Sequence, residues 1–145
     1  MHNISSNFQL TKVQNATAAG STDVTSDSVD MLNYDTVMFH LTFGTITSGA
    51  VTSIHVEQSA NDSSFADLTG TNVTVADDDD NQVFWVEVTN PGDRYLRLIV
   101  DRATQNAVVG EIYALRGRGG EEAVDNNVTD TITGELHVSP AEGTI

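Results

Sequence analysis

The stretch "YDTVMFHLTF", residues 34–43, alternates between two kinds of side chain with a period of two residues. In an extended strand, this period places successive side chains on opposite sides of the backbone. One side is uniformly apolar, with Val37, Phe39, Leu41 and Phe43, and the other side carries Thr36, Met38, His40 and Thr42. A strand with one fully apolar side must pack that side against another layer of secondary structure. The stretch therefore predicts a layered β fold.

Comparable stretches lie on both sides of it. They are "FQLTKVQNA" (8–16), "GAVTSIHVEQS" (49–59), "TNVTVA" (71–76), "NQVFWVEV" (81–88), "RYLRLIVDRAT" (94–104) and "NAVVGEIYALR" (106–116). Segments rich in Asn, Asp, Ser and Gly separate most of them, and no stretch repeats apolar residues at the helical period with a cap at each end. Roughly six or seven short strands are expected between residues 34 and 116. The sequence predicts an all-β protein, an antiparallel β-sandwich or jelly roll, with flexible terminal arms.

The composition divides the chain into three parts. Residues 29–116 are the predicted β-sandwich domain, and residues 1–28 are expected to be an N-terminal arm that includes a candidate first strand. From residue 117 the chain is rich in glycine and then acidic, so 117–145 is predicted to be a glycine hinge and an acidic C-terminal arm without its own core. Within that arm, "DTITGELHV" (130–138) is expected to pair as a strand where another surface offers an edge.

The charge of the chain argues against several classes of partner. The sequence has 21 acidic and 6 basic residues, a formal net charge of −15, which disfavours binding to nucleic acid or to an anionic membrane. Cysteine is absent, which excludes disulfides and thiolate chemistry. We also expect no signal peptide and no membrane span. The basic residues Arg94, Arg97, Arg102, Arg116 and Arg118 are close in sequence, so one mixed-charge region is expected on an acidic surface.

Four consecutive aspartates, Asp77, Asp78, Asp79 and Asp80, separate two of the predicted strands. A helix-loop-helix calcium loop that began at Asp77 would need glycine at its sixth position and glutamate at its twelfth. The sequence has Gln82 and Val88 there. We therefore interpret the aspartates as the solvated tip of a hairpin. An irregular calcium site and an acidic docking contact remain alternatives, and no metal or cofactor is predicted.

Catalytic motifs are weak or missing. His40 and His55 lie on successive predicted strands, but no patterned third ligand accompanies them as zinc would require. Neither a Gly-x-Ser-x-Gly elbow, a dinucleotide fingerprint nor a phosphate-binding loop with its lysine occurs. We expect that the protein is not an enzyme.

The outward sides of several strands are more apolar than a solvated surface requires. Val83 and Trp85 accompany Glu87, Tyr95 and Ile99 flank Arg97, and Met38 and His40 lie on the second side of residues 34–43. One explanation is that the N-terminal segment or a thick sandwich covers them. The other is a protein–protein interface, because such surfaces are enriched in Trp, Tyr and Arg. The candidate interface is Trp85, Tyr95, Arg97, Met38 and His40, with the arm after residue 117 as a second contact.

Residues 29–116 resemble a family of small structural proteins of tailed bacteriophages, the capsid decoration or cement type, usually encoded near the major capsid protein. The matching features, in order, are the "GTIT" turn, the "QSANDSSFADL" loop, the "ADDDD" segment, "RYLRLIV" and "ATQNAV". The resemblance covers about two-thirds of the chain and contains no catalytic motif. It does not include residues 1–28 or the tail.

This resemblance implies a function. Such a protein decorates the outer surface of a phage capsid, bridges neighbouring capsomers and stabilises the expanded head. Its partner is the major capsid protein, it forms a homo-oligomer, with a trimer favoured, and it is made in the host cytoplasm before it joins the virion. The alternatives are a head–tail joining or tail structural protein, or a carbohydrate-binding or adhesion module that uses Trp85 and Tyr95.

The division into a domain and an arm is testable. Deleting residues 121–145 should leave the β fold intact but weaken assembly, because an arm without its own core adds contact area rather than core packing. Circular dichroism measures the first effect, and sedimentation of the assembly measures the second. Loss of the β spectrum in the truncated protein would contradict the arm assignment.

Overall fold

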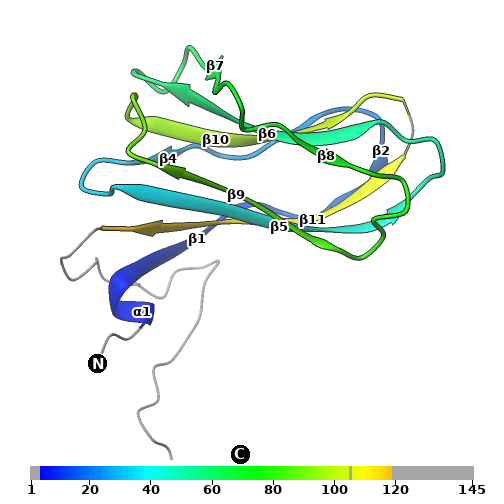
Figure 1. Cartoon of the computed structure of the whole chain (residues 1–145), viewed down its shortest axis with the longest axis horizontal. Coiled ribbons are helices and arrows are strands. Elements are labelled where there is room, and N and C mark those ends of the chain that lie inside the picture. The colour runs from blue at the N-terminus through cyan, green and yellow to red at the C-terminus, as the bar shows by residue number, and fades with distance from the viewer. Residues whose placement is uncertain (1–3, 105, 119–145) are drawn as a thin grey trace, which may run out of the picture.

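The computed structural model describes residues 4–104 and 106–118, which form two antiparallel β-sheets packed face to face (Figure 1). The predicted all-β sandwich is confirmed. The acidic arm and its expected strand at 130–138 lie outside the described residues. In the described part of the chain, no helix is long and apolar enough to cross a membrane.

Each strand belongs to one of two sheets. Sheet A has the order β1-β11-β5-β9, and β2 also pairs with β11. Sheet B has the order β3-β10-β6-β7, with β4 on β10 and β8 on β6. The elements are α1 (Ile4–Asn7), β1 (Phe8–Gln14), β2 (Thr17–Gly20), β3 (Val24–Thr25), β4 (Val29–Asp30), β5 (Thr36–Ile46), β6 (Thr52–Ser59), β7 (Ala66–Asp67), β8 (Val73–Val75), β9 (Val83–Thr89), β10 (Tyr95–Arg102) and β11 (Ala107–Gly117).

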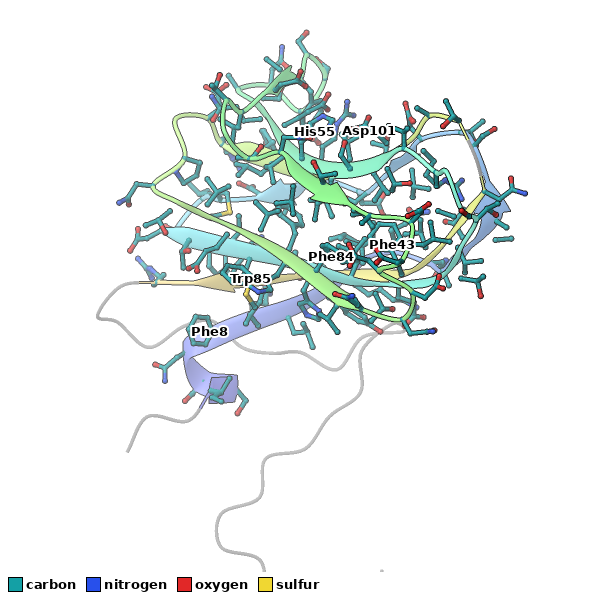
Figure 2. All side chains as sticks on the ribbon, turned by 45° about the vertical axis from the view of Figure 1, so that its right-hand side comes forward. Phe8, Phe43, His55, Phe84, Trp85 and Asp101 are labelled. Atoms are coloured by element: carbon teal, nitrogen blue, oxygen red, sulfur yellow. The ribbon has the colours of Figure 1, made fainter. Side chains whose placement is uncertain are left out.

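The alternating apolar side chains of residues 34–43 lie on strand β5, where every second side chain is buried. Val37, Phe39, Leu41 and Phe43 are at most 1% exposed and lie in the core between the sheets. Phe43 packs edge-to-face on Phe84 of β9, with ring centroids 5.4 Å apart (Figure 2). Phe84, Val86 and Val88 form the inward side of β9, opposite the residues that the sequence places outward. The core is therefore built from strand sides that the sequence identifies.

The N-terminal segment belongs to the sandwich. β1 and β2 pair with β11 in sheet A, whereas β3 and β4 pair with β10 in sheet B. Val13, Val24 and Val29 are buried in the common core. The sandwich therefore begins before residue 29, and the candidate strand at residues 8–16 is β1.

The four aspartates do not form the tip of a hairpin. β8 before them pairs with β6 in sheet B, and β9 after them pairs with β5 in sheet A, so the segment crosses between the sheets. Both flanking segments look like strands in the sequence, but β8 and β9 do not pair with each other as the two strands of a hairpin would. Backbone amides bind three of the carboxylates: Gly49 N to Asp77 at 2.5 Å, Ala76 N to Asp79 at 2.8 Å and Ile46 N to Asp80 at 2.6 Å. These aspartates therefore hold turns at one end of the sandwich.

A buried arginine connects the two sheets. Arg102 ends β10 in sheet B and is only 2% exposed. Its guanidinium donates hydrogen bonds to the carbonyls of Thr22 at 2.7 Å, Ala18 at 2.9 Å and Ala107 at 2.8 Å. Ala18 and Ala107 belong to β2 and β11 of sheet A. One side chain therefore satisfies carbonyls of both the N-terminal segment and the last strand.

Replacing this arginine should destabilise the sandwich strongly. Arg102→Met keeps much of the side-chain volume but leaves three carbonyls without their donor. Only the hydrogen bond to the Ala107 carbonyl is fully buried, and those to Thr22 and Ala18 are partly buried. Because an unsatisfied buried polar group costs about 1–3 kcal/mol, we expect the free energy of unfolding to fall by about 1–3 kcal/mol. Urea unfolding followed by circular dichroism measures the change. Arg94→Met, at a solvent-exposed ion pair, is the control, and an equal loss in that variant would contradict the assignment.

Candidate binding face on sheet A

The outward side of sheet A gathers apolar and aromatic side chains from four strands. The register aligns Leu10, Leu115, Met38 and Glu87 in one row across the strands, and Lys12, Tyr113, His40 and Trp85 in the next. These residues alternate along their strands with buried ones such as Phe39, Val86 and Ala114. We call these two rows, together with Phe8 and Val83, the outer face of sheet A.

Exposure on this face is greatest at β9. Trp85 is 59% exposed and Val83 is 63% exposed, whereas Leu10 on β1 is 36% exposed. β9 is the last strand of the sheet order, so Trp85 lies near an edge of the face. Figure 2 shows Trp85 and Phe8 on the side of the molecule that lies away from His55 and Asp101 of sheet B. A large indole surface is therefore available to a partner.

The middle of the face is a stacked aromatic pair. The rings of His40 and Tyr113 are nearly parallel, 16° apart, with centroids separated by 5.4 Å. Burial lowers the pKa of His40 below its ordinary value of 6.5, so its imidazole is neutral at pH 7. The Tyr113 hydroxyl donates to Glu111, which also accepts from Lys12 Nζ at 3.4 Å. The centre is therefore uncharged, and charge lies towards β1.

Phe8 depends on a glycine. A Cβ added to Gly117 would lie 2.7 Å from the Phe8 ring, which is closer than real Cβ atoms approach. The missing side chain allows the Phe8 ring to lie against β11 where β1 pairs with it. Phe8 thereby extends the apolar surface of the face towards α1.

The predicted interface residues separate into two groups. Met38, His40 and Trp85 lie together on the outer face of sheet A, whereas Tyr95 and Arg97 lie on the outward side of β10 in sheet B. Arg97 Nε donates to Glu57 at 2.6 Å, and its guanidinium stands 3.9 Å from the ring centroid of Phe65. The guanidinium of Arg94 lies 5.1 Å from the ring centroid of Tyr95. Both of the sheet B residues therefore have partners within the chain.

Five members of the face are not identified from the sequence. They come from β1 and β11, the first and last described strands, and are Phe8, Leu10, Lys12, Tyr113 and Leu115. Their alternation with Val13, Ile112 and Ala114 is visible in the sequence, but their adjacency to Met38 and His40 comes from long-range pairing. The acidic segment at residues 77–80 is not part of this face, because it binds the turns that follow β5 and β8.

The face is suited to non-covalent binding. An exposed indole, a thioether and aliphatic side chains offer area that a partner can remove from water. Lys12 and Glu87 lie at opposite ends of the two rows and provide polar points at the margin. An apolar centre with a polar margin is the general arrangement of protein interfaces.

Comparisons with known proteins identify the fold. No family model and no curated protein matches the sequence. Among solved structures, the PBSX exported protein XepA matches with a TM-score of 0.55 and 17% identity, over 96% of this chain and 46% of that one. This chain thus spans about half the length of XepA, and the two share a β-sandwich fold.

Two further structures match with lower scores. The CBM22-1 xylan-binding domain of Paenibacillus barcinonensis Xyn10C has a TM-score of 0.45 and 9% identity, over 82% of this chain and 94% of that one. The structure of the infectious bursal disease virus Gt strain has a TM-score of 0.38 and 13% identity, over 78% of this chain and 32% of that one.

The burial of His40 against Tyr113 leads to a prediction about the pKa of its imidazole. Its imidazole should titrate below pH 6.5, because burial against Tyr113 penalises the charged form. The unfolded chain then takes up this proton at a higher pH than the folded one, so the contribution of His40 to stability falls as the pH drops below about 6.5. Histidine NMR titration measures the pKa. Tyr113→Ser should move it back towards 6.5, and a wild-type value at or above 6.5 would contradict the burial argument.

Proposed function

We propose that this protein is a non-enzymatic structural component of a phage virion that decorates the outer surface of the capsid. It binds the major capsid protein across neighbouring capsomers and stabilises the expanded head. The observation that carries this proposal is the outer face of sheet A, where Trp85 is 59% exposed beside Met38 and His40. The resemblance of residues 29–116 to phage decoration proteins supplies the identity of the partner.

The exposed indole offers enough binding energy to anchor a contact. An aromatic side chain buries about 150–250 Å² when it is fully covered, so covering the exposed part of Trp85 removes roughly 100 Å² from water. At about 25 cal/mol per Å², this burial contributes about 2.5 kcal/mol. Met38 and Leu115 lie in the neighbouring row of the same face and enlarge the contact. Exposed aromatic residues that become buried on binding dominate the energetics of many interfaces.

The cement role also has a thermodynamic basis. A protein that binds only the expanded shell stabilises that state by mass action. Several weak contacts from one homo-oligomer, which we expect to be a trimer, combine through effective concentration. The net charge of −15 reduces competition from nucleic acid in the host cytoplasm. These properties support a structural protein of the outer capsid surface.

Binding to shells tests the proposal directly. Wild-type protein should co-sediment with expanded heads of the parent phage and raise the temperature at which they break. Trp85→Ala should weaken binding at least about tenfold, since about 1.4 kcal/mol corresponds to a factor of ten. Val51→Ala is a matched control, because Val51 is 61% exposed but lies outside the outer face of sheet A. If the wild type and Trp85→Ala bind expanded heads equally well, the outer face of sheet A is not the surface that binds the capsid.

Imaging separates decoration from the other virion roles. Electron microscopy of the parent particle should show density of this protein over the shell. Density confined to the neck or the tail would replace decoration with a head–tail joining or tail role.

Sugar binding is the second candidate, because the exposed Trp85 ring offers a flat apolar surface. Signal on a glycan array that Trp85→Ala abolishes, without any binding to shells, would favour it.

A further inference from the structure

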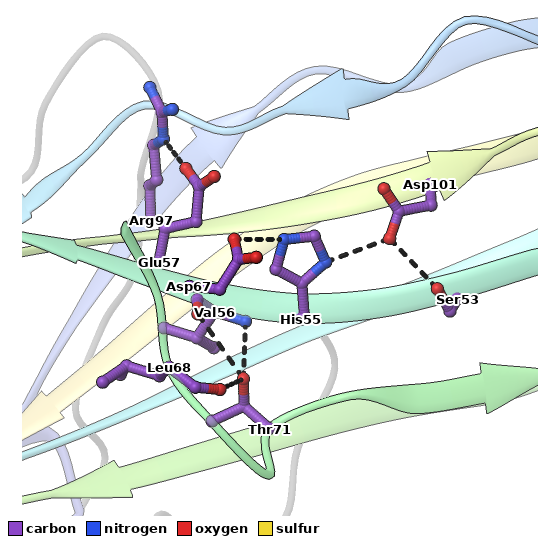
Figure 3. A network of polar contacts seen from close by, with 9 residues as sticks. All are labelled: Ser53, His55, Val56, Glu57, Asp67, Leu68, Thr71, Arg97 and Asp101. Atoms are coloured by element: carbon purple, nitrogen blue, oxygen red, sulfur yellow. Dashed lines mark hydrogen bonds and ion pairs between the residues drawn. The ribbon is translucent and has the colours of Figure 1, made fainter. Parts of the chain in front are cut away.

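The outward side of sheet B holds a cluster with different chemistry. His55 and Glu57 are alternate residues of β6, so both point away from the core that contains Ile54 and Val56. Asp67 of β7 pairs with Glu57 in register, and Asp101 lies on the neighbouring strand β10 (Figure 3). One ligand atom from each of His55, Glu57 and Asp67 can be chosen so that all three atoms lie within 4.8 Å of one another. We propose that these three side chains bind a divalent cation of the zinc class.

The hydrogen bonds of His55 orient its ring for this role. Nδ1 lies 3.0 Å from Asp101 Oδ2, and the same oxygen accepts a hydrogen bond from Ser53 at 3.0 Å. If Nδ1 carries the proton and donates it to Asp101, the lone pair is on Nε2. A carboxylate that holds one imidazole nitrogen while the other binds the ion is the usual outer arrangement of metal-binding histidines. Asp101 is therefore a positioning residue.

The second nitrogen of His55 faces an acceptor. Nε2 lies 3.3 Å from Asp67 Oδ1. In the tautomer that Asp101 favours, this contact places a lone pair against a carboxylate, which is unfavourable unless a proton or a metal cation lies between them. Zinc bonds of about 2.0–2.2 Å at tetrahedral angles place neighbouring ligand atoms about 3.3–3.5 Å apart. The observed separation therefore matches one edge of a zinc coordination tetrahedron.

Glu57 supplies the third ligand. Arg97 Nε binds its Oε2 atom at 2.6 Å, so an ion would bind through Oε1. Arg97 is itself held over the Phe65 ring, at 3.9 Å from the centroid, and thereby keeps the carboxylate in place. One carboxylate oxygen of Glu57 already lies within 4.8 Å of the ligand atoms of His55 and Asp67. A water molecule would complete four-coordination.

The local charge and exposure fit a divalent ion. Glu57, Asp67 and Asp101 bring three negative charges, and Arg97 brings one positive charge. With a neutral imidazole, two negative charges remain, which a divalent cation balances. The side chains of His55 and Glu57 are 17% and 16% exposed, whereas that of Asp67 is 77% exposed, so an ion can enter from the Asp67 side.

Binding would have a structural consequence. β7 contains only Ala66 and Asp67 and pairs with β6 at two positions. An ion shared by His55, Glu57 and Asp67 would tie this short strand to the sheet, and with it the connection between β6 and β8. The site lies on sheet B and does not depend on the outer face of sheet A.

Metal titration of the full-length chain tests the proposal. The protein is treated with EDTA, dialysed and titrated with Zn²⁺ by calorimetry, and Co²⁺ absorption reports the geometry of the site. We expect one ion per chain and a rise in Tm on adding Zn²⁺. His55→Ala should abolish binding, Asp67→Asn should weaken it at least about tenfold, and Asp101→Asn should weaken it about 10–100-fold.

Controls separate this site from other metal binding. His40→Ala tests a histidine on the other sheet, and Asp78→Asn tests the acidic segment; both should bind as the wild type does. Asp67 is exposed, so Asp67→Asn should keep the fold even if His55→Ala does not, and circular dichroism checks both.

Two outcomes would overturn the proposal. In the first, His55 is a protonated imidazolium that binds Asp67 and Asp101, and the protein binds no Zn²⁺. In the second, the protein binds Zn²⁺, but His55→Ala and Asp67→Asn leave the affinity unchanged. Trp85→Ala should bind Zn²⁺ normally, which keeps this result separate from capsid binding.

Discussion

The buried guanidinium of Arg102 is the constraint on which the described sandwich depends. Apolar side chains between two sheets favour contact between the sheets. They do not by themselves determine how one sheet is positioned relative to the other. Arg102 leaves sheet B and donates to carbonyls of Ala18 and Ala107 in sheet A and to Thr22 between β2 and β3. Because a charged group inside a protein is costly unless its donors are satisfied, these carbonyls must be where the side chain can reach them. The N-terminal segment and the last strand are thereby held to the same point.

The sandwich leaves two outward faces with contrasting chemistry. The face of sheet A is apolar and aromatic, centred on the stacked rings of His40 and Tyr113 and ending in the exposed indole of Trp85. The face of sheet B is polar, with His55 between two carboxylates and Arg97 paired with Glu57. Binding to a large partner and binding to an ion require these different surfaces, because the first gains from removing apolar area from water and the second from concentrated charge. One small domain can therefore carry both roles without competition between them.

Much of the fold follows from the sequence, and less of the candidate site does. The alternation of β5 and β9 identifies Phe39 and Val86 as inward and His40 and Trp85 as outward, and the structure agrees. Two flanks that look like strands predict that the acidic segment at residues 77–80 is a hairpin tip. It instead crosses between sheets, since β8 pairs with β6 and β9 with β5. The outward apolar and aromatic residues predict that Tyr95 and Arg97 share an interface with Trp85, but β10 belongs to the other sheet.

The β class, the inward side of β5 and the acidic net charge can be read from the sequence alone. These properties are local or additive: alternation is read from neighbouring residues, and net charge is a sum. The identity of neighbouring strands is a property of the folded chain, because hydrogen bonds between strands can join segments far apart in the chain with little dependence on side-chain identity. That pairing brought Leu10, Tyr113 and Leu115 beside Met38 and His40, and it placed Asp67 and Asp101 on either side of His55.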